Sequence, residues 1–154
     1  MDMHMRKMPM EELVQLIGMQ LSKGGRATLT VTGCSMLPML RSYRDTVELI
    51  PVTQRRKKGD IVLYRRENGC YVLHRIVALD GESYICCGDN QAAKERVDHN
   101  QLIAVVDAFV KNGKKYTLDM PGYRAYVRVW VGLFPLRPYY IAIRRRIGRL
   151  RRRY

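Results

Sequence analysis

The sequence has few of the features that mark a secreted or metal-binding protein. It contains only four cysteines, and two of them, Cys86 and Cys87, are adjacent, which is unlike a secreted disulfide framework. No secretory signal precedes them, so the cytoplasm is the expected compartment. Neither Cys-x-x-Cys nor His-x-x-x-His spacing occurs among the 154 residues. We therefore expect no metal site and no cofactor.

Acidic residues are scarce as well. Asp and Glu total 14 against 28 Lys and Arg, which gives a net charge of +14. The excess is uneven, because residues 144–153 hold seven arginines and no acid, leaving +7 for the rest of the chain. Apolar residues make up 47% of the sequence and recur in periodic segments, so a wholly disordered chain is excluded. The length is that of one domain with a real core.

No apolar run is long and clean enough for a membrane span. Residues 125–143 are rich in apolar side chains, but they contain Arg128 and also Arg137, which lies between two prolines. An arginine at the centre of a span costs roughly 2.5–3.5 kcal/mol, whereas each Leu, Ile or Phe contributes about 0.3–0.6 kcal/mol. We expect no transmembrane helix.

The periodicity predicts a mainly β protein with a helix at each end. Apolar spacing favours a helix over residues 10–23, and Gly24-Gly25 ends it. Three Asx-Gly pairs predict tight hairpins and together an antiparallel meander. Strands are expected at 27–32, 46–50, 61–65, 71–78, 83–87, 102–110 and 115–118. The expected organisation is a helical segment (1–26), a β-rich domain (27–120) and an apolar, Arg-rich C-terminal segment (121–154).

Three polar residues on separate elements have the chemistry of a hydrolytic site. Ser35 follows the first strand in a turn, His74 lies in the strand at 71–78, and Asp89 directly follows the strand at 83–87. A serine hydroxyl needs a neighbouring base, which a third group often orients. Alternation puts His74 on the apolar face and Arg75 on the other, so burial should keep the imidazole neutral. A turn serine, a core histidine and a capping aspartate are the alternative interpretation.

The sequence around these residues resembles the signal peptidase I superfamily, which also includes the LexA-like self-cleaving repressors. The Ser-Met-x-Pro box of that superfamily matches residues 35–38, and its Gly-Asp-Ile-Val box matches residues 59–62. The segment with the base matches residues 74–76, and the later Gly-Asp box matches residues 88–90. The four boxes occur in family order. The resemblance implies the antiparallel coiled sheets of that catalytic fold and a serine endopeptidase acting on a peptide or protein substrate.

The resemblance also implies roles for individual residues. Ser35 would be the nucleophile, and His74 would be the base, as in the endoplasmic-reticulum, archaeal and sporulation-type signal peptidases. We favour Asp89 as the acid, but in that group an acid shortly after the Gly-Asp box often serves, so Glu95 and Asp98 are alternatives.

The serine box departs from the signal peptidase pattern. Gly33-Cys34 replaces the usual Ser-Gly, which removes a hydroxyl that helps to bind the oxyanion in leader peptidases. The oxyanion would therefore depend mainly on backbone donors, including the N–H of Ser35 itself. We interpret Cys34 as a small residue packed under the turn rather than as an alternative nucleophile.

The C-terminal segment predicts a basic amphipathic helix over residues 139–153. Its apolar side chains form one stripe and its seven arginines cover the rest. The stripe consists of Tyr140, Ile143, Ile147 and Leu150. Such a helix suits an anionic bilayer surface and would make the protein peripheral at the cytoplasmic membrane. A tail that covers its own domain is the alternative, while nucleic acid is disfavoured because no aromatic stacking pattern accompanies the arginines.

Two alternatives to the endopeptidase stay open. A LexA-like self-cleaving regulator would usually carry an Ala-Gly or Cys-Gly bond and a DNA-binding domain before the serine. This chain has neither bond there, and about 33 residues are too few for that domain. A non-catalytic peptide- or membrane-binding module on the same fold is the other alternative.

Overall fold

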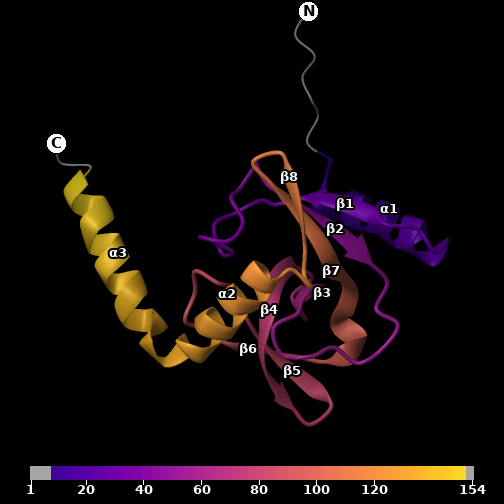
Figure 1. Cartoon of the computed structure of the whole chain (residues 1–154). Coiled ribbons are helices and arrows are strands. Elements are labelled where there is room, and N and C mark those ends of the chain that lie inside the picture. Colours follow the sequence, from indigo (N-terminus) through magenta and orange to yellow (C-terminus); the bar gives the residue numbers. More distant parts are fainter. Residues whose placement is uncertain (1–7, 152–154) are drawn as a thin grey trace, which may run out of the picture.

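A single antiparallel sheet dominates the chain (Figure 1). The computed structural model describes residues 8–151. The strands are β1 (Ala27–Thr30), β2 (Thr46–Ile50), β3 (Ile61–Arg65), β4 (Tyr71–Asp80), β5 (Ser83–Cys87), β6 (Glu95–Val97), β7 (Leu102–Lys111) and β8 (Lys114–Thr117). The helices are α1 (Met10–Ser22), α2 (Pro121–Gly132) and α3 (Arg137–Arg151), with 3-10 turns η1 (His99–Gln101) and η2 (Phe134–Leu136). The mainly antiparallel β architecture expected from the sequence is confirmed.

The strand order is β1-β2-β7-β3-β4-β5-β6, with β8 beside β7. The expected meander holds for β3 to β6, which pair in sequence order. It is wrong for the whole sheet, because β7 inserts between β2 and β3. Hairpin signals report only strands that are adjacent in sequence, so a late strand that enters the middle of a sheet leaves no such signal. At the β7–β8 turn, Asn112 and Gly113 have φ values of 52° and 75°, as the expected hairpin requires.

Buried apolar residues form two clusters, one of which joins α1 to the sheet. Ile17 and Leu21 of α1 pack with Leu29, Val47 and other strand residues in the first cluster. The second cluster surrounds Tyr64 and Ile76. The strands β3 and β4 contribute to both clusters, which is why their burial is nearly continuous rather than alternating.

The C-terminal segment folds into two helices rather than one. Pro121 begins α2, a helix that the sequence interpretation did not include, and α3 begins two residues earlier than expected. In Figure 1, α2 lies against the sheet and α3 (yellow) extends away from it. Leu150's side chain and residues 152–154 lie outside the described part of the chain. Within residues 8–151, none of the helices combines the length and apolar character that crossing a bilayer requires.

Candidate active site

Ser35 lies in the turn that follows β1 and rests on the loop after β5. Its carbonyl oxygen accepts a hydrogen bond of 2.7 Å from the backbone N–H of Asn90. A Cβ on Gly88 would come within 2.6 Å of that same oxygen and 3.0 Å of the Ser35 Cβ. Only glycine allows this approach, since a 2.6 Å contact to backbone cannot be relieved by side-chain motion. The Gly-Asp box therefore has a structural reason at its first residue.

Met36, not Cys34, fills the space beneath the turn. Met36 is 1% exposed and belongs to the first core cluster. The expectation that Cys34 packs under the turn is wrong, because its side chain is exposed. The core already has a larger apolar side chain at the next-but-one position, and burial of that side chain leaves Cys34 on the outside of the turn.

His74 occupies the middle of β4 and is 2% exposed. Its Nδ1 atom lies 3.1 Å from Glu95 Oε1 and 3.1 Å from the hydroxyl oxygen of Tyr64. An ionised carboxylate only accepts hydrogen bonds, so we assign the ring proton to Nδ1. The other ring nitrogen, Nε2, is then free of a proton and takes part in no hydrogen bond described for residues 8–151. The buried imidazole is thus held in the tautomer that a general base needs.

Burial lowers the pKa of His74, although the nearby Glu95 carboxylate acts in the opposite direction. The ring therefore stays neutral near pH 7. For Glu95, burial alone would raise the pKa, but hydrogen bonds from Arg66 and Tyr64 outweigh it and bring the pKa below its ordinary value. An ionised acid beside a neutral base is the charge state that a serine hydrolase requires in its resting form.

Two residues that the sequence analysis did not single out hold Glu95 in place. Arg66 donates from Nε to Oε2 at 2.7 Å and from Nη2 to Oε1 at 2.8 Å, and Tyr64 donates its hydroxyl to Oε1. Burial, followed by Glu95, raises the pKa of Tyr64, so its hydroxyl stays protonated as a donor. The Asn68-Gly69 hairpin could have revealed Tyr64, because its register puts this ring diagonal to His74 on the same face.

Asp89 does not orient the imidazole, contrary to our expectation. Its carboxylate accepts two hydrogen bonds of 2.8 Å from Arg75, and both side chains are fully buried. A further bond comes from the Tyr126 hydroxyl of α2, at 3.2 Å. Because successive residues of a strand face opposite sides, Arg75 and His74 diverge, and Asp89 lies on the Arg75 side. The acid in contact with His74 is Glu95, the first of the two alternatives.

Asp98, the other alternative, lies elsewhere. It precedes η1, and its Oδ1 accepts a hydrogen bond from the Ser83 hydroxyl. Its role is therefore local, at the start of a short turn of 3-10 helix.

Ser35 and His74 line the same cavity, of about 260 Å³, which we call the active-site pocket. Two segments border it, residues 29–32 at the end of β1 and residues 71–74 of β4. A direct hydrogen bond between Ser35 Oγ and His74 is not among those of residues 8–151, and the backbone N–H of Ser35 has no described partner either. The structure thus brings Ser35 and His74 to one pocket, where the Ser35 hydroxyl, His74 Nε2 and the Ser35 N–H have no hydrogen-bond partner among residues 8–151.

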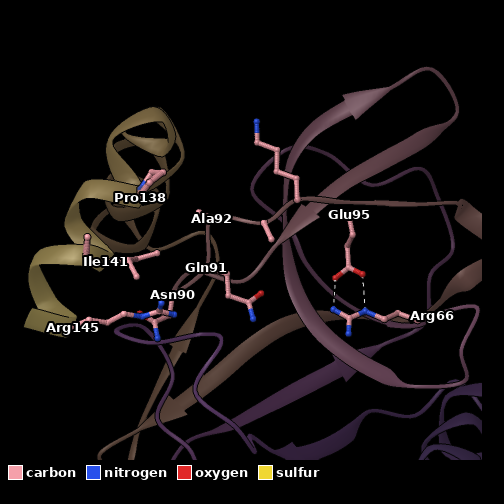
Figure 2. Close-up of a pocket in the computed structure, with 11 residues that line it drawn as sticks. Arg66, Asn90, Gln91, Ala92, Glu95, Pro138, Ile141 and Arg145 are labelled. Atoms are coloured by element: carbon pink, nitrogen blue, oxygen red, sulfur yellow. Dashed lines mark hydrogen bonds and ion pairs between the residues drawn. The ribbon is translucent and has the colours of Figure 1, made fainter. Parts of the chain in front are cut away.

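A second cavity, of about 510 Å³, adjoins the first and is called here the α3 groove (Figure 2). Arg66 and Gln91 line both cavities. One wall is the segment from Asn90 to Glu95, and the other is one face of α3. No group of three or more His, Cys, Asp or Glu side chains within residues 8–151 is arranged to hold a metal ion.

No model of a known protein family matches this chain, and no curated protein matches it either. The resemblance to the signal peptidase superfamily is carried by the four sequence boxes.

Proposed function

We propose that the protein is a serine endopeptidase of the signal peptidase I type, with Ser35 as nucleophile, His74 as general base and Glu95 as the orienting acid. The observation that carries the proposal is the shared pocket of Ser35 and His74, where an ionised Glu95 holds Nδ1 and leaves Nε2 unprotonated. Such an arrangement suits a base that must accept a proton from a hydroxyl.

The proposed reaction uses each of these three residues in turn. Ser35 Oγ attacks the carbonyl carbon of the scissile peptide bond while its proton passes to His74 Nε2. His74, now an imidazolium beside Glu95, returns that proton to the leaving amine as the C–N bond breaks. Water then attacks the acyl carbon and loses a proton to Nε2. The bond to Ser35 Oγ breaks, Oγ takes that proton from His74, and the carboxylic acid of the cleaved peptide leaves. In enzymes without substrate, the serine–histidine contact is often longer than a hydrogen bond and closes in the complex.

Backbone donors support the oxyanion. The Ser35 N–H has no described partner and lies in the turn held by Met36 and the loop after β5. Loss of one donor can cost roughly 3–4 kcal/mol of transition-state stabilisation, so the absence of a hydroxyl two residues before Ser35 predicts slow turnover.

The edges of the pocket favour an extended peptide as substrate. Within residues 8–151, β1 lies at the end of the sheet and pairs only with β2. In β4, residues 71–74 pair with β3 alone, because the pairing with β5 begins at Arg75. Both bordering segments therefore have unpaired backbone groups that a substrate strand could use.

The test compares the parent protein with Ser35→Ala on a peptide library, with cleavage mapped by mass spectrometry. We expect the variant to fold normally and to lose cleavage. Unchanged cleavage would refute the assignment. A serine-directed acylating reagent separates the enzyme from a non-catalytic module, because only the enzyme should be labelled at Ser35. A specific self-cut at alkaline pH would instead favour the LexA-like regulator.

We also propose that α3 binds the surface of an anionic membrane. Four of its apolar side chains are more than 40% exposed, and residues 137–151 contain no Asp or Glu. These side chains are Tyr139, Tyr140, Ile143 and Ile147. Exposed apolar groups flanked by arginines match the interfacial region of an anionic bilayer, where the rings and alkyl chains are buried and the cations remain at the headgroups.

A further inference from the structure

The α3 groove continues the active-site pocket past its catalytic residues. Arg66 and Gln91 line both cavities, and Glu95, whose Oε1 contacts His74, lines the groove. A peptide bound across Ser35 would therefore pass from one cavity into the other without leaving the surface. Figure 2 shows the two walls, with Glu95 and Arg66 joined on one side and Pro138, Ile141 and Arg145 on the other.

The groove carries an excess of positive charge. Its lining includes three cations and one acid. Arg66 and Glu95 neutralise each other through two hydrogen bonds. Lys94 and Arg145 have no carboxylate partner among the ion pairs described for residues 8–151. The Lys94 ammonium lies 4.4 Å from the centre of the Phe134 ring, which fixes the side chain without neutralising it. Two uncompensated cations thus face the same groove.

Besides the uncharged polar residues Asn90 and Gln91, the rest of the lining consists of five apolar residues. They are Ala92, Ala93, Pro138, Ile141 and Ala142. An apolar lining with cations on both walls suits a peptide that alternates small and acidic side chains. A free phosphate would make no use of the apolar lining, and nucleic-acid bases would find no aromatic side chain in it to stack on.

We propose that the α3 groove binds an acidic segment of the peptide substrate, adjoining the scissile bond, with its carboxylates near Lys94 and Arg145. The inference takes the peptide nature of the ligand from the proposed function. It makes recognition of that substrate partly electrostatic and therefore sensitive to salt.

Binding is measured by NMR with the full-length Ser35→Ala protein, so that hydrolysis is not required. The ligands are two blocked hexapeptides of alternating alanine and glutamate, or alanine and glutamine. We expect the glutamate peptide to bind at least tenfold more tightly and to shift the amide signals of residues 90–95 and 139–145. Equal affinity for the two peptides, or shifts confined to other surfaces, would overturn the proposal.

Charge reversal on α3 supplies the matched variants. Arg145→Glu should weaken binding of the glutamate peptide about tenfold and should favour a peptide with lysine in place of glutamate. Arg146→Glu changes the net charge equally, but Arg146 does not line the groove, so its affinity should match the parent. Equal losses in the two variants would indicate only general attraction and would contradict the proposal. If the glutamate peptide binds as expected while the parent protein cleaves nothing in the library, the endopeptidase proposal fails and the groove stands as a binding site.

Discussion

Single-residue alternation along β4 decides which carboxylate contacts the imidazole of His74. His74 and Arg75 are neighbours in sequence, yet each has its own carboxylate, Glu95 for His74 and Asp89 for Arg75. The Gly-Asp box places Asp89 at the end of β5, near β4, which is why proximity in sequence made it the favoured acid. Which face an acid reaches is set by tertiary packing of the loop, and no sequence pattern in the chain specified that.

Replacing Glu95 with glutamine tests the assignment through the pH profile. In the parent protein, burial lowers the pKa of His74, so the acid limb of kcat/KM should lie below the ordinary value of 6.5. The limb marks protonation of the neutral imidazole as the pH falls through the pKa of His74 in the folded protein. Glu95 opposes this lowering, so Glu95→Gln should shift the limb to still lower pH and reduce kcat about a hundredfold.

Asp98→Asn is the control for that measurement. The substitution removes one carboxylate near β6, and Asp98 contacts Ser83 rather than His74. Its profile should coincide with that of the parent. A shift of the acid limb to higher pH in Glu95→Gln, or an equal shift in both variants, would show that Glu95 does not act on the imidazole.

At the scale of elements, α2 covers Asp89 and thereby supports the turn that contains Ser35. Tyr126 donates to the Asp89 carboxylate, and the Trp130 ring nitrogen donates to its carbonyl at 3.2 Å. Arg137, at the start of α3, is 3% exposed and donates to the carbonyl of Gly88 at 3.1 Å. The loop on which Ser35 rests is therefore held from its far side by the C-terminal helices. Arg137, whose charge makes a membrane span unfavourable, is thus a buried residue that holds this loop in place.

Asp89→Asn should destabilise the fold rather than alter the base. Removing one member of a fully buried ion pair leaves Arg75 uncompensated, which typically costs about 3–5 kcal/mol. Urea unfolding monitored by circular dichroism measures the loss. The double variant Arg75→Met with Asp89→Asn should recover much of it, since no unpaired charge remains. A stable Asp89→Asn protein with an altered acid limb would return Asp89 to the role of orienting acid.

Sequence patterns located most strands but not the elements that complete the site. Three strands, β2, β3 and β5, match the expected boundaries because their apolar β-branched runs are bounded by turn residues. The strand β6 is only three residues long and begins with two charged side chains, so it shows no alternation of apolar and polar residues that would predict a strand. Yet β6 carries Glu95. The sequence did not predict α2, because the partners of its aromatic residues are brought to it only by folding. Tyr123 contacts Arg75, and Tyr126 and Trp130 contact Asp89.

At the scale of the whole molecule, α3 has two faces of different character. The residues that line the groove and those that stay apolar and exposed fall on opposite faces of the helix at 3.6 residues per turn. The groove side includes Ile141 and Arg145, and the exposed apolar side includes Ile143 and Ile147. A helix that lies on a bilayer through the second face would leave the groove and the adjoining active-site pocket facing away from the lipid.

Vesicle co-sedimentation tests this arrangement. The protein should bind vesicles of phosphatidylcholine with phosphatidylglycerol, bind pure phosphatidylcholine weakly, and dissociate as salt is raised, because exposed charges are screened over about 10 Å at 0.1 M. The double variant Ile143→Asp with Ile147→Asp should bind at least tenfold more weakly, since each change removes an apolar contact and adds repulsion. Leu16→Asp with Met19→Asp is the control, because these α1 residues are 47% and 58% exposed, close to the 60% and 50% of Ile143 and Ile147. Equal losses in the two double variants would mean that α3 is not the contact surface. Binding that persists on uncharged vesicles at high salt would mean that the arginines do not contribute. That result would contradict the proposal that α3 recognises an anionic surface.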